Sequence, residues 1–79
     1  MKTIIITVFF KILFLDSQNQ ETLTGVRVET NNGVYYSDLS GEVFIPTEEK
    51  IISVDYVSYI SLDNLSSQSD TTIHLSQIK

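Results

Sequence analysis

The chain has no cysteine, a single proline and only three glycines among its 79 residues. Without cysteine, neither a disulfide framework nor a thiolate metal site can support the fold. So little proline and glycine leaves no room for a flexible linker. A chain of this length forms one domain, residues 1–79, and buries only about 60% of the surface that it exposes when unfolded. We therefore predict a single domain that rests on one small apolar core.

Basic residues are also scarce. Five Lys and Arg residues stand against ten Asp and Glu residues, which gives a net charge of −5. Nucleic-acid binding requires a basic footprint, so the composition argues against that function. The most apolar stretch, residues 1–15, contains Lys11 and is too short for a membrane-spanning helix. We expect no nucleic-acid partner and no transmembrane segment.

The sequence is rich in short stretches in which apolar and polar residues alternate. Alternation among β-branched and aromatic residues is typical of β-strands. The pattern recurs over residues 25–30, 34–37, 42–46, 51–59 and 71–75, with a weaker strand near residues 60–65. Several short strands at this spacing predict an all-β fold, a small antiparallel β-sandwich of about seven strands.

Two turns are predicted between these strands. Asn31-Asn32-Gly33 is a hairpin signal, because Asn-Gly suits turns that need positive φ. Asp38 and Gly41 stand first and fourth in Asp38-Leu39-Ser40-Gly41, as in a type I turn. Gln77 to Lys79 should fray at the end of the chain.

The apolar parity of each strand gives a predicted core. Its members are Phe14, Val26, Val28, Val43, Ile45, Ile52, Val54, Ile73 and Leu75. The tyrosines Tyr35, Tyr36, Tyr56 and Tyr59 admit two interpretations. They form an aromatic ligand surface, or Tyr56 and one of the Tyr35/Tyr36 pair belong to the core with their hydroxyls at the sheet rim.

Residues 1–15 also admit two interpretations. Lys2, an apolar run and a polar segment from Asp16 resemble a signal peptide. Against this, Lys11 interrupts the run and no small-residue cleavage motif precedes Ser17. The abundance of Ile, Val, Thr and Phe instead favours a β-strand.

Residues for catalysis or metal binding are few. His74 is the only histidine, and its place on the outward parity of a strand predicts an exposed polar residue. Asp38 is a turn former rather than a calcium ligand, since a calcium site needs several oxygen ligands at short spacing. The His-x-x-Glu pattern of zinc peptidases is missing. We predict no catalytic residue, no metal site and no cofactor.

The order of the motifs resembles the carboxypeptidase regulatory-like domain, a transthyretin-like (prealbumin-like) β-sandwich. The first strand ends in Asp16, and Leu23-Thr24-Gly25-Val26-Arg27-Val28 follows the polar loop. Then come Ser37-Asp38-Leu39-Ser40-Gly41-Glu42-Val43, Val57-Ser58-Tyr59 and Ile73-His74-Leu75. The resemblance covers roughly residues 10 to 76 and implies a transthyretin-like fold.

The chain departs from the family pattern at three positions. Ser37 replaces Thr, Val43 replaces an aromatic residue and Ser58 replaces Gly. Because glycine permits backbone geometry that serine resists, we expect the corner near Tyr59 to differ from the family form.

The resemblance also decides between the two interpretations of the N-terminal stretch. If Asp16 ends the first strand, residues 1–15 belong to the folded domain, with Phe10, Ile12 and Phe14 pointing inward. Relatives of the family imply the cell envelope or periplasm as location, although the chain carries no convincing cleavable signal peptide.

This register places a candidate partner surface on the opposite side of the first strand. Phe9, Lys11, Leu13 and Leu15 then face outward, with Phe44 beside them. An exposed apolar patch on a small domain usually marks association. We predict a protein partner or self-association through Phe9, Leu13, Leu15 and Phe44, the alternative being that neighbouring loops cover them.

Three functional hypotheses follow. The resemblance favours a non-enzymatic interaction or structural module like those of bacterial envelope proteins. The alternatives are a small hydrolase of the transthyretin-related type, or a fragment of a larger outer-membrane receptor or surface protein. Clustering of His74 with Arg27 and a carboxylate would favour the hydrolase, and their dispersal would favour the module.

Overall fold

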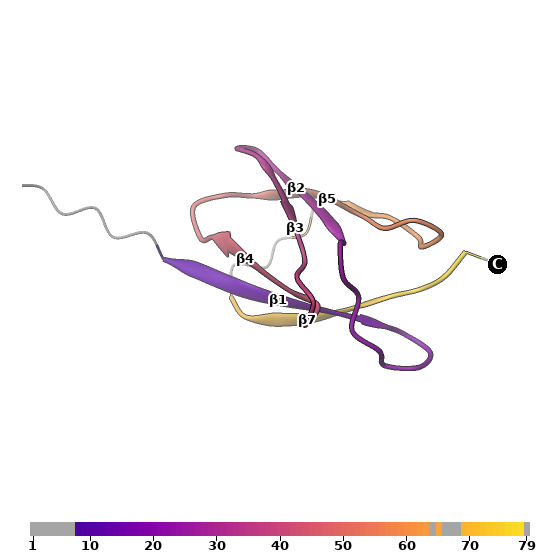
Figure 1. The fold of residues 1–79 in the computed structure, drawn as a ribbon. Helices are drawn as coiled ribbons and strands as arrows, with labels where there is room; N and C mark the ends of the chain where they lie inside the picture. The colour runs from indigo at the N-terminus through magenta and orange to yellow at the C-terminus, as the bar shows by residue number, and fades with distance from the viewer. Residues whose placement is uncertain (1–7, 64, 66–68, 79) are drawn as a thin grey trace, which may run out of the picture.

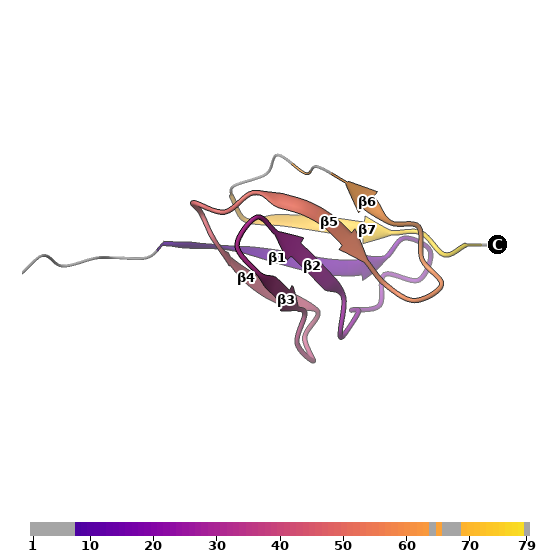
Figure 2. The same ribbon diagram turned by 90° about the horizontal axis from the view of Figure 1, so that it is seen from above.

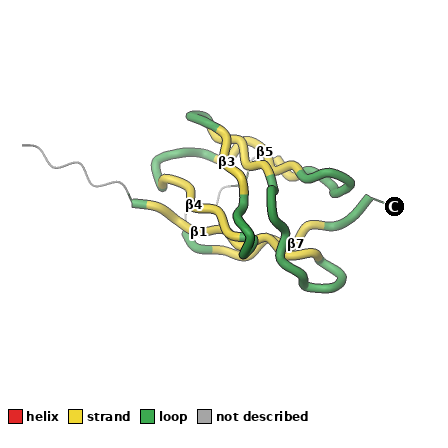
Figure 3. The backbone as a smooth tube through the Cα atoms, viewed as in Figure 1, coloured by secondary structure: helices red, strands yellow, loops and turns green. Residues whose placement is uncertain are grey.

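The computed structural model describes residues 8–63, 65 and 69–78. Within these ranges the chain forms strands and loops but no helix (Figure 3). The strands are β1 (Phe9–Asp16), β2 (Arg27–Thr30), β3 (Val34–Tyr36), β4 (Glu42–Pro46), β5 (Ile51–Asp55), β6 (Leu62–Asp63) and β7 (Thr71–Leu75). The prediction of a small all-β sandwich with about seven strands is confirmed.

The strands form two sheets that lie in separate layers. One sheet has the order β4-β1-β7 and the other β3-β2-β5-β6. Figures 1 and 2 show the two layers, with β1 between β4 and β7. Among the described strands, the pairings are antiparallel except that β1 and β7 run parallel. The expected purely antiparallel sandwich is therefore corrected, because β7 returns to β1 after the whole second sheet and needs no hairpin to reach it.

The core lies between the two sheets and is built around β1. Successive side chains of a strand point to opposite faces, so Phe10, Ile12 and Phe14 enter the core, where each is at most 2% exposed. The remaining buried apolar residues are Leu23, Val26, Val28, Val43, Ile45, Ile51, Val54 and Leu75. Ile73 is only partly buried and packs against this cluster. Residues 9–15 thus belong to the folded domain as predicted, whereas residues 1–7 lie outside the described ranges.

One predicted core residue is wrong. Ile52 is 42% exposed, and its neighbour Ile51 is buried instead. The cause is a register shift between β2 and β5: Glu29 pairs with Ser53, but the next residue, Thr30, pairs with Ile51. The extra residue is a β-bulge, which reverses the parity of the strand beyond it. Val54, on the other side of the bulge, stays buried as predicted.

Both predicted turns occur. The backbone N–H of Gly41 donates to the carbonyl of Asp38 at 2.9 Å, and Gly41 has a φ of 77°. The Asp38 carboxylate accepts hydrogen bonds from the backbone N–H groups of Ser40 and Glu42, which accounts for an aspartate at this position. The second turn connects β2 to β3 but does not use positive φ at Gly33. There the Thr30 hydroxyl accepts hydrogen bonds from backbone N–H groups of the turn.

The end of the described chain is held more firmly than expected. Gln77 forms a bridge with Tyr59, and the backbone N–H of Ile78 donates to the carbonyl of Ser58 at 2.8 Å. The predicted fraying therefore does not apply to Gln77 and Ile78, and Lys79 lies outside the described residues. These contacts tie the segment after β7 to the loop after β5, so they connect the two sheets at one end.

Candidate functional site

The predicted partner surface lies on the outer side of the β4-β1-β7 sheet. Phe9 and Phe44 are 52% and 53% exposed. Leu13 and Leu15, further along β1, are partly buried. We call Phe9, Leu13, Leu15 and Phe44 the apolar face. It is open at the Phe9 end and partly covered at the Leu15 end, where Thr22 of the following loop pairs with β1.

The register of β1 and β4 brings the two phenylalanines together. Lys11 is paired with Phe44, and its ammonium lies 3.1 Å from the carboxylate of Glu42, the diagonal neighbour. Phe9 is paired with Pro46, and Phe44 precedes Pro46 by two residues on β4. Phe9 and Phe44 are therefore diagonal neighbours, as Lys11 and Glu42 are. Diagonal neighbours lie within reach of aromatic side chains. The exposed part of the apolar face is therefore contiguous.

Lys11 and Glu42 form a partly exposed ion pair on this face. Asp70 lies beside the pair, since its carboxylate accepts a hydrogen bond from the backbone N–H of Lys11 at 2.7 Å. The Lys11–Glu42 pair itself adds no net charge to the face. An exposed pair of this kind contributes only about 0–1 kcal/mol to folding, so stability alone does not require these two charges.

His74 and Arg27 do not come together. His74 is exposed on β7, and its Nε2 lies 3.1 Å from Oε1 of Gln20. Arg27 is on β2, on the side of its sheet opposite to the buried Val26 and Val28. The two residues thus lie on opposite outer faces of the sandwich. Among the described residues, no three His, Cys, Asp or Glu side chains are grouped to hold a metal ion.

Asp16 is the centre of a buried polar cluster. Its side chain, 1% exposed, accepts hydrogen bonds from the Tyr59 hydroxyl at 2.5 Å, the Gln77 amide at 2.9 Å and the backbone N–H of Gln18 at 2.7 Å. The bond from Tyr59, followed by those from Gln77 and Gln18, holds the pKa of Asp16 well below its usual range. The same bond raises the pKa of Tyr59. The cluster joins the end of β1 to the corner at Tyr59 and to the segment after β7.

Ser58, beside this cluster, was expected to resist the backbone geometry of glycine. The structure places Ser58 at a φ of 68°, in the left-handed region that glycine adopts readily. The backbone N–H of Tyr59 donates to the carbonyl of Tyr56 at 3.0 Å, which closes the turn. The two tyrosine rings are 5.2 Å apart between centroids. Ser58 therefore adopts the glycine-like backbone conformation despite its side chain, and the expected difference from the family form stays a prediction.

A second buried carboxylate lies at the other end of the sandwich. Glu49, 5% exposed, accepts hydrogen bonds from the hydroxyls of Thr30 and Tyr35. The bond to Glu49 raises the pKa of Tyr35. Among the described residues, every buried polar side-chain atom has a hydrogen-bond partner. Like the Asp16 cluster, this group links segments that are distant in the sequence, since Glu49 lies after β4, Thr30 on β2 and Tyr35 on β3.

The tyrosines divide between the two predicted interpretations. Tyr35, Tyr56 and Tyr59 pack against the core, whereas Tyr36 is 61% exposed. Tyr36 lines a groove of about 440 Å³ on the outer side of the β3-β2-β5-β6 sheet, which also involves Gly25, Arg27, Asp55, Tyr56, Val57 and Ser61. Sequence reasoning missed this groove. The outward parity of Arg27, Tyr36 and Asp55 was readable, but their alignment across three strands depends on register.

Comparison with protein-family models, with curated proteins and with solved structures finds no match to this chain. No helix in the described part of the chain has the length and apolar character needed to cross a membrane. The features of this chain that bear on function are therefore the outer faces of its two sheets.

Proposed function

We propose that the chain is a non-enzymatic interaction module that associates with a second copy of itself through the apolar face. The observation that carries the proposal is the exposed pair Phe9 and Phe44, diagonal neighbours on a face where the two charges of Lys11 and Glu42 are paired. A small soluble domain rarely exposes a contiguous apolar patch without a binding role. The separation of His74 from Arg27 supports a module over a hydrolase.

Charge explains why the second copy docks on this face. Two copies with a net charge of −5 repel each other wherever their acidic surfaces meet. On the apolar face this repulsion is reduced, because Lys11 and Glu42 form an ion pair. A two-fold interface is self-complementary, so Lys11 of one copy can lie opposite Glu42 of the other. The apolar face is small beside the roughly 800 Å² per partner of a standard interface, and we expect a weak dimer.

We also propose that the module is a carboxypeptidase regulatory-like domain, the family that the sequence motifs resemble. The carboxypeptidase regulatory-like motifs fall at structural key points: Asp16 in its buried cluster, Asp38 and Gly41 in their turn, and Tyr59 bonded to Asp16. By this resemblance the module would serve within the envelope proteins of bacteria.

Sedimentation equilibrium over a range of concentrations tests the proposal. The wild-type chain should show a reversible dimer with a Kd on the order of 100 µM. Leu13→Lys and Phe44→Lys, which place a charge in the apolar face, should each remain monomeric. Val34→Lys is the matched control, because Val34 is 42% exposed on the other sheet, and it should dimerise like the wild type. A wild-type monomer at all concentrations would contradict the proposal.

A further inference from the structure

The groove on the outer side of the β3-β2-β5-β6 sheet is separate from the apolar face. Its volume of about 440 Å³ falls within the range of small-molecule sites. Arg27 pairs with Tyr36 on one side and with Asp55 on the other. Paired residues of neighbouring strands project to the same side of a sheet, so these three side chains stand in one row. The row forms the floor of the groove.

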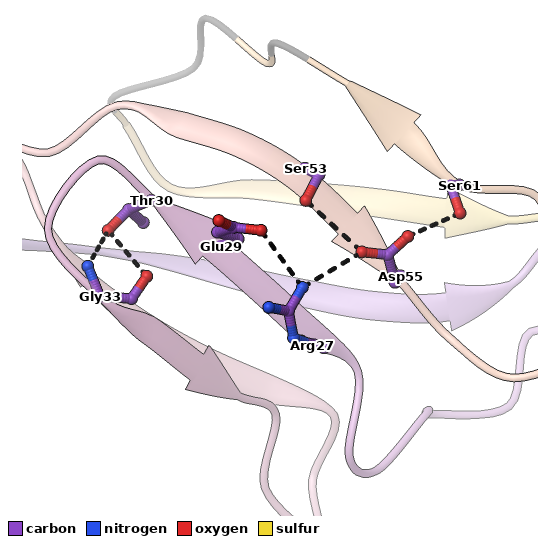
Figure 4. A network of polar contacts seen from close by, with 7 residues as sticks. All are labelled: Arg27, Glu29, Thr30, Gly33, Ser53, Asp55 and Ser61. Carbon is purple, nitrogen blue, oxygen red and sulfur yellow. Dashed lines mark hydrogen bonds and ion pairs between the residues drawn. The ribbon is translucent and has the colours of Figure 1, made fainter.

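Polar groups in the groove supply both hydrogen-bond donors and acceptors. Nη1 of Arg27 lies 3.4 Å from carboxylate oxygens of both Glu29 and Asp55 (Figure 4). The other oxygen of Asp55 accepts a hydrogen bond from the Ser61 hydroxyl at 2.7 Å. Both ion pairs use one nitrogen of the guanidinium, which carries five N–H donors in all. Arg27 therefore retains donors that can reach a ligand.

Two carboxylates flank the guanidinium of Arg27, so the three groups carry one net negative charge and disfavour anionic ligands most. An anion that approaches Arg27 also meets the carboxylates of Glu29 and Asp55, and a cation that approaches those carboxylates meets Arg27. A neutral ligand avoids both penalties. Hydroxyl groups donate and accept hydrogen bonds, so adjacent hydroxyls can accept from Arg27 while they donate to Asp55.

The aromatic side of the groove adds a second requirement. Tyr36 is 61% exposed at the end of the row. Its ring face is electron-rich and suits the weakly positive C–H bonds on the flat side of a sugar ring. We propose that the groove binds a neutral glycan, whose ring stacks on Tyr36 while its hydroxyls bond to Arg27, Asp55 and Ser61.

The test is a titration of the isotopically labelled full chain, followed by backbone amide chemical shifts in NMR. The probes are four neutral hexasaccharides: cellohexaose, maltohexaose, mannohexaose and chitohexaose. At least one should shift the signals of Gly25, Arg27, Tyr36 and Val57 at concentrations up to about 10 mM. A hexamer of galacturonic acid and hexalysine should each shift the signals of these four residues less than the neutral probe, or not at all.

Two variants show whether the contact is the one described. Tyr36→Ala removes an exposed ring, so the chain should still unfold cooperatively, and its Kd should rise roughly 10-fold or more. Val34→Ala, on the same strand but not lining the groove, should bind like the wild type. The proposal is overturned if none of the four neutral probes binds, if the acidic or basic hexamer binds more tightly, or if Tyr36→Ala binds unchanged.

Discussion

Ser58 holds a backbone conformation that residues with a side chain rarely adopt, with φ at 68°. This conformation costs roughly 1–2 kcal/mol for an L-residue, and glycine avoids the cost. Glycine also adds freedom to the unfolded chain, so Ser58→Gly should stabilise the fold by a net of about 0.5–1 kcal/mol.

Ser40 offers a matched control, because it is also an exposed serine in a turn but has no positive φ. Ser40→Gly should lower the free energy of unfolding, since only the unfolded chain gains from the change. Urea denaturation measures both variants. Equal effects of the two substitutions would show that the backbone at Ser58 is not strained.

Asp16 gives the fold a dependence on acid. Its pKa is lowered in the folded state, first by the hydrogen bond from Tyr59, so folding favours the ionised carboxylate. This contribution is complete above the pKa of the unfolded chain, about 4, and is lost as the pH falls toward the lower pKa of the folded state. The melting temperature should therefore drop between about pH 4 and pH 2.

Asp16→Asn should be less stable than the wild type at neutral pH and should show a flatter fall of melting temperature in acid. Asp63→Asn is the control, because Asp63 is exposed on β6, and it should keep the wild-type profile. Circular dichroism melts across the pH range provide the measurement. An Asp16→Asn profile as steep as that of the wild type would assign the acid sensitivity to other groups.

At the scale of the elements, the β-bulge of β5 decides which isoleucine supports the core. Ile51 is 3% exposed and Ile52 42%. Ile51→Ala should cost about 2–5 kcal/mol of unfolding free energy, whereas Ile52→Ala should cost less than about 1 kcal/mol. Denaturant unfolding of the two variants is a comparison of neighbours with identical chemistry. If Ile52→Ala cost more unfolding free energy than Ile51→Ala, β5 would have no bulge at Ile52.

The strands could be predicted from the sequence, because the alternation of apolar and polar residues indicates which face of a strand is buried. Val26, Val28 and Val54 were assigned correctly on this basis. The bulge at Ile52 was not predictable, since local sequence does not reveal an extra residue that arises from pairing with a distant strand. The parallel pairing of β1 with β7 has the same origin in contacts between remote segments.

For the two outer faces, the sequence predicted which side chains point outward but not which of them are neighbours. The outward parity of Phe9, Leu13 and Leu15 followed from one strand alone. The diagonal placement of Phe9 and Phe44, and the row of Arg27 between Tyr36 and Asp55, required the register of neighbouring strands. The turn at Asn31–Gly33 limits the register of β2 with β3, but β1 with β4 and β2 with β5 are not joined by a tight turn, so a single sequence does not fix their registers.

At the scale of the whole molecule, the sandwich presents two unlike outer surfaces. The β4-β1-β7 sheet carries the apolar face with the Lys11–Glu42 pair, and the β3-β2-β5-β6 sheet carries the groove around Arg27. Because the surfaces lie on opposite sides, a dimer formed through the apolar face leaves both grooves open. Substitutions in one surface should therefore leave the function of the other unchanged.

Exchange of the charges of Lys11 and Glu42 tests most directly whether two copies associate through the apolar face. In the proposed dimer, Lys11 of each copy lies opposite Glu42 of the other. Lys11→Glu alone places two pairs of like charges across the interface, and so does Glu42→Lys. Each variant by itself should remain monomeric in sedimentation equilibrium, while retaining its fold because the exposed pair contributes only about 0–1 kcal/mol.

Mixing the two variants restores opposite charges at both positions, so the mixture should form a heterodimer at least as tight as the wild-type dimer. If Lys11 lies opposite Glu42 of the second copy, the mixture should contain dimers and the separate samples only monomers. A mixture that stays monomeric while the wild type dimerises would contradict the arrangement, and so would single variants that dimerise as the wild type does.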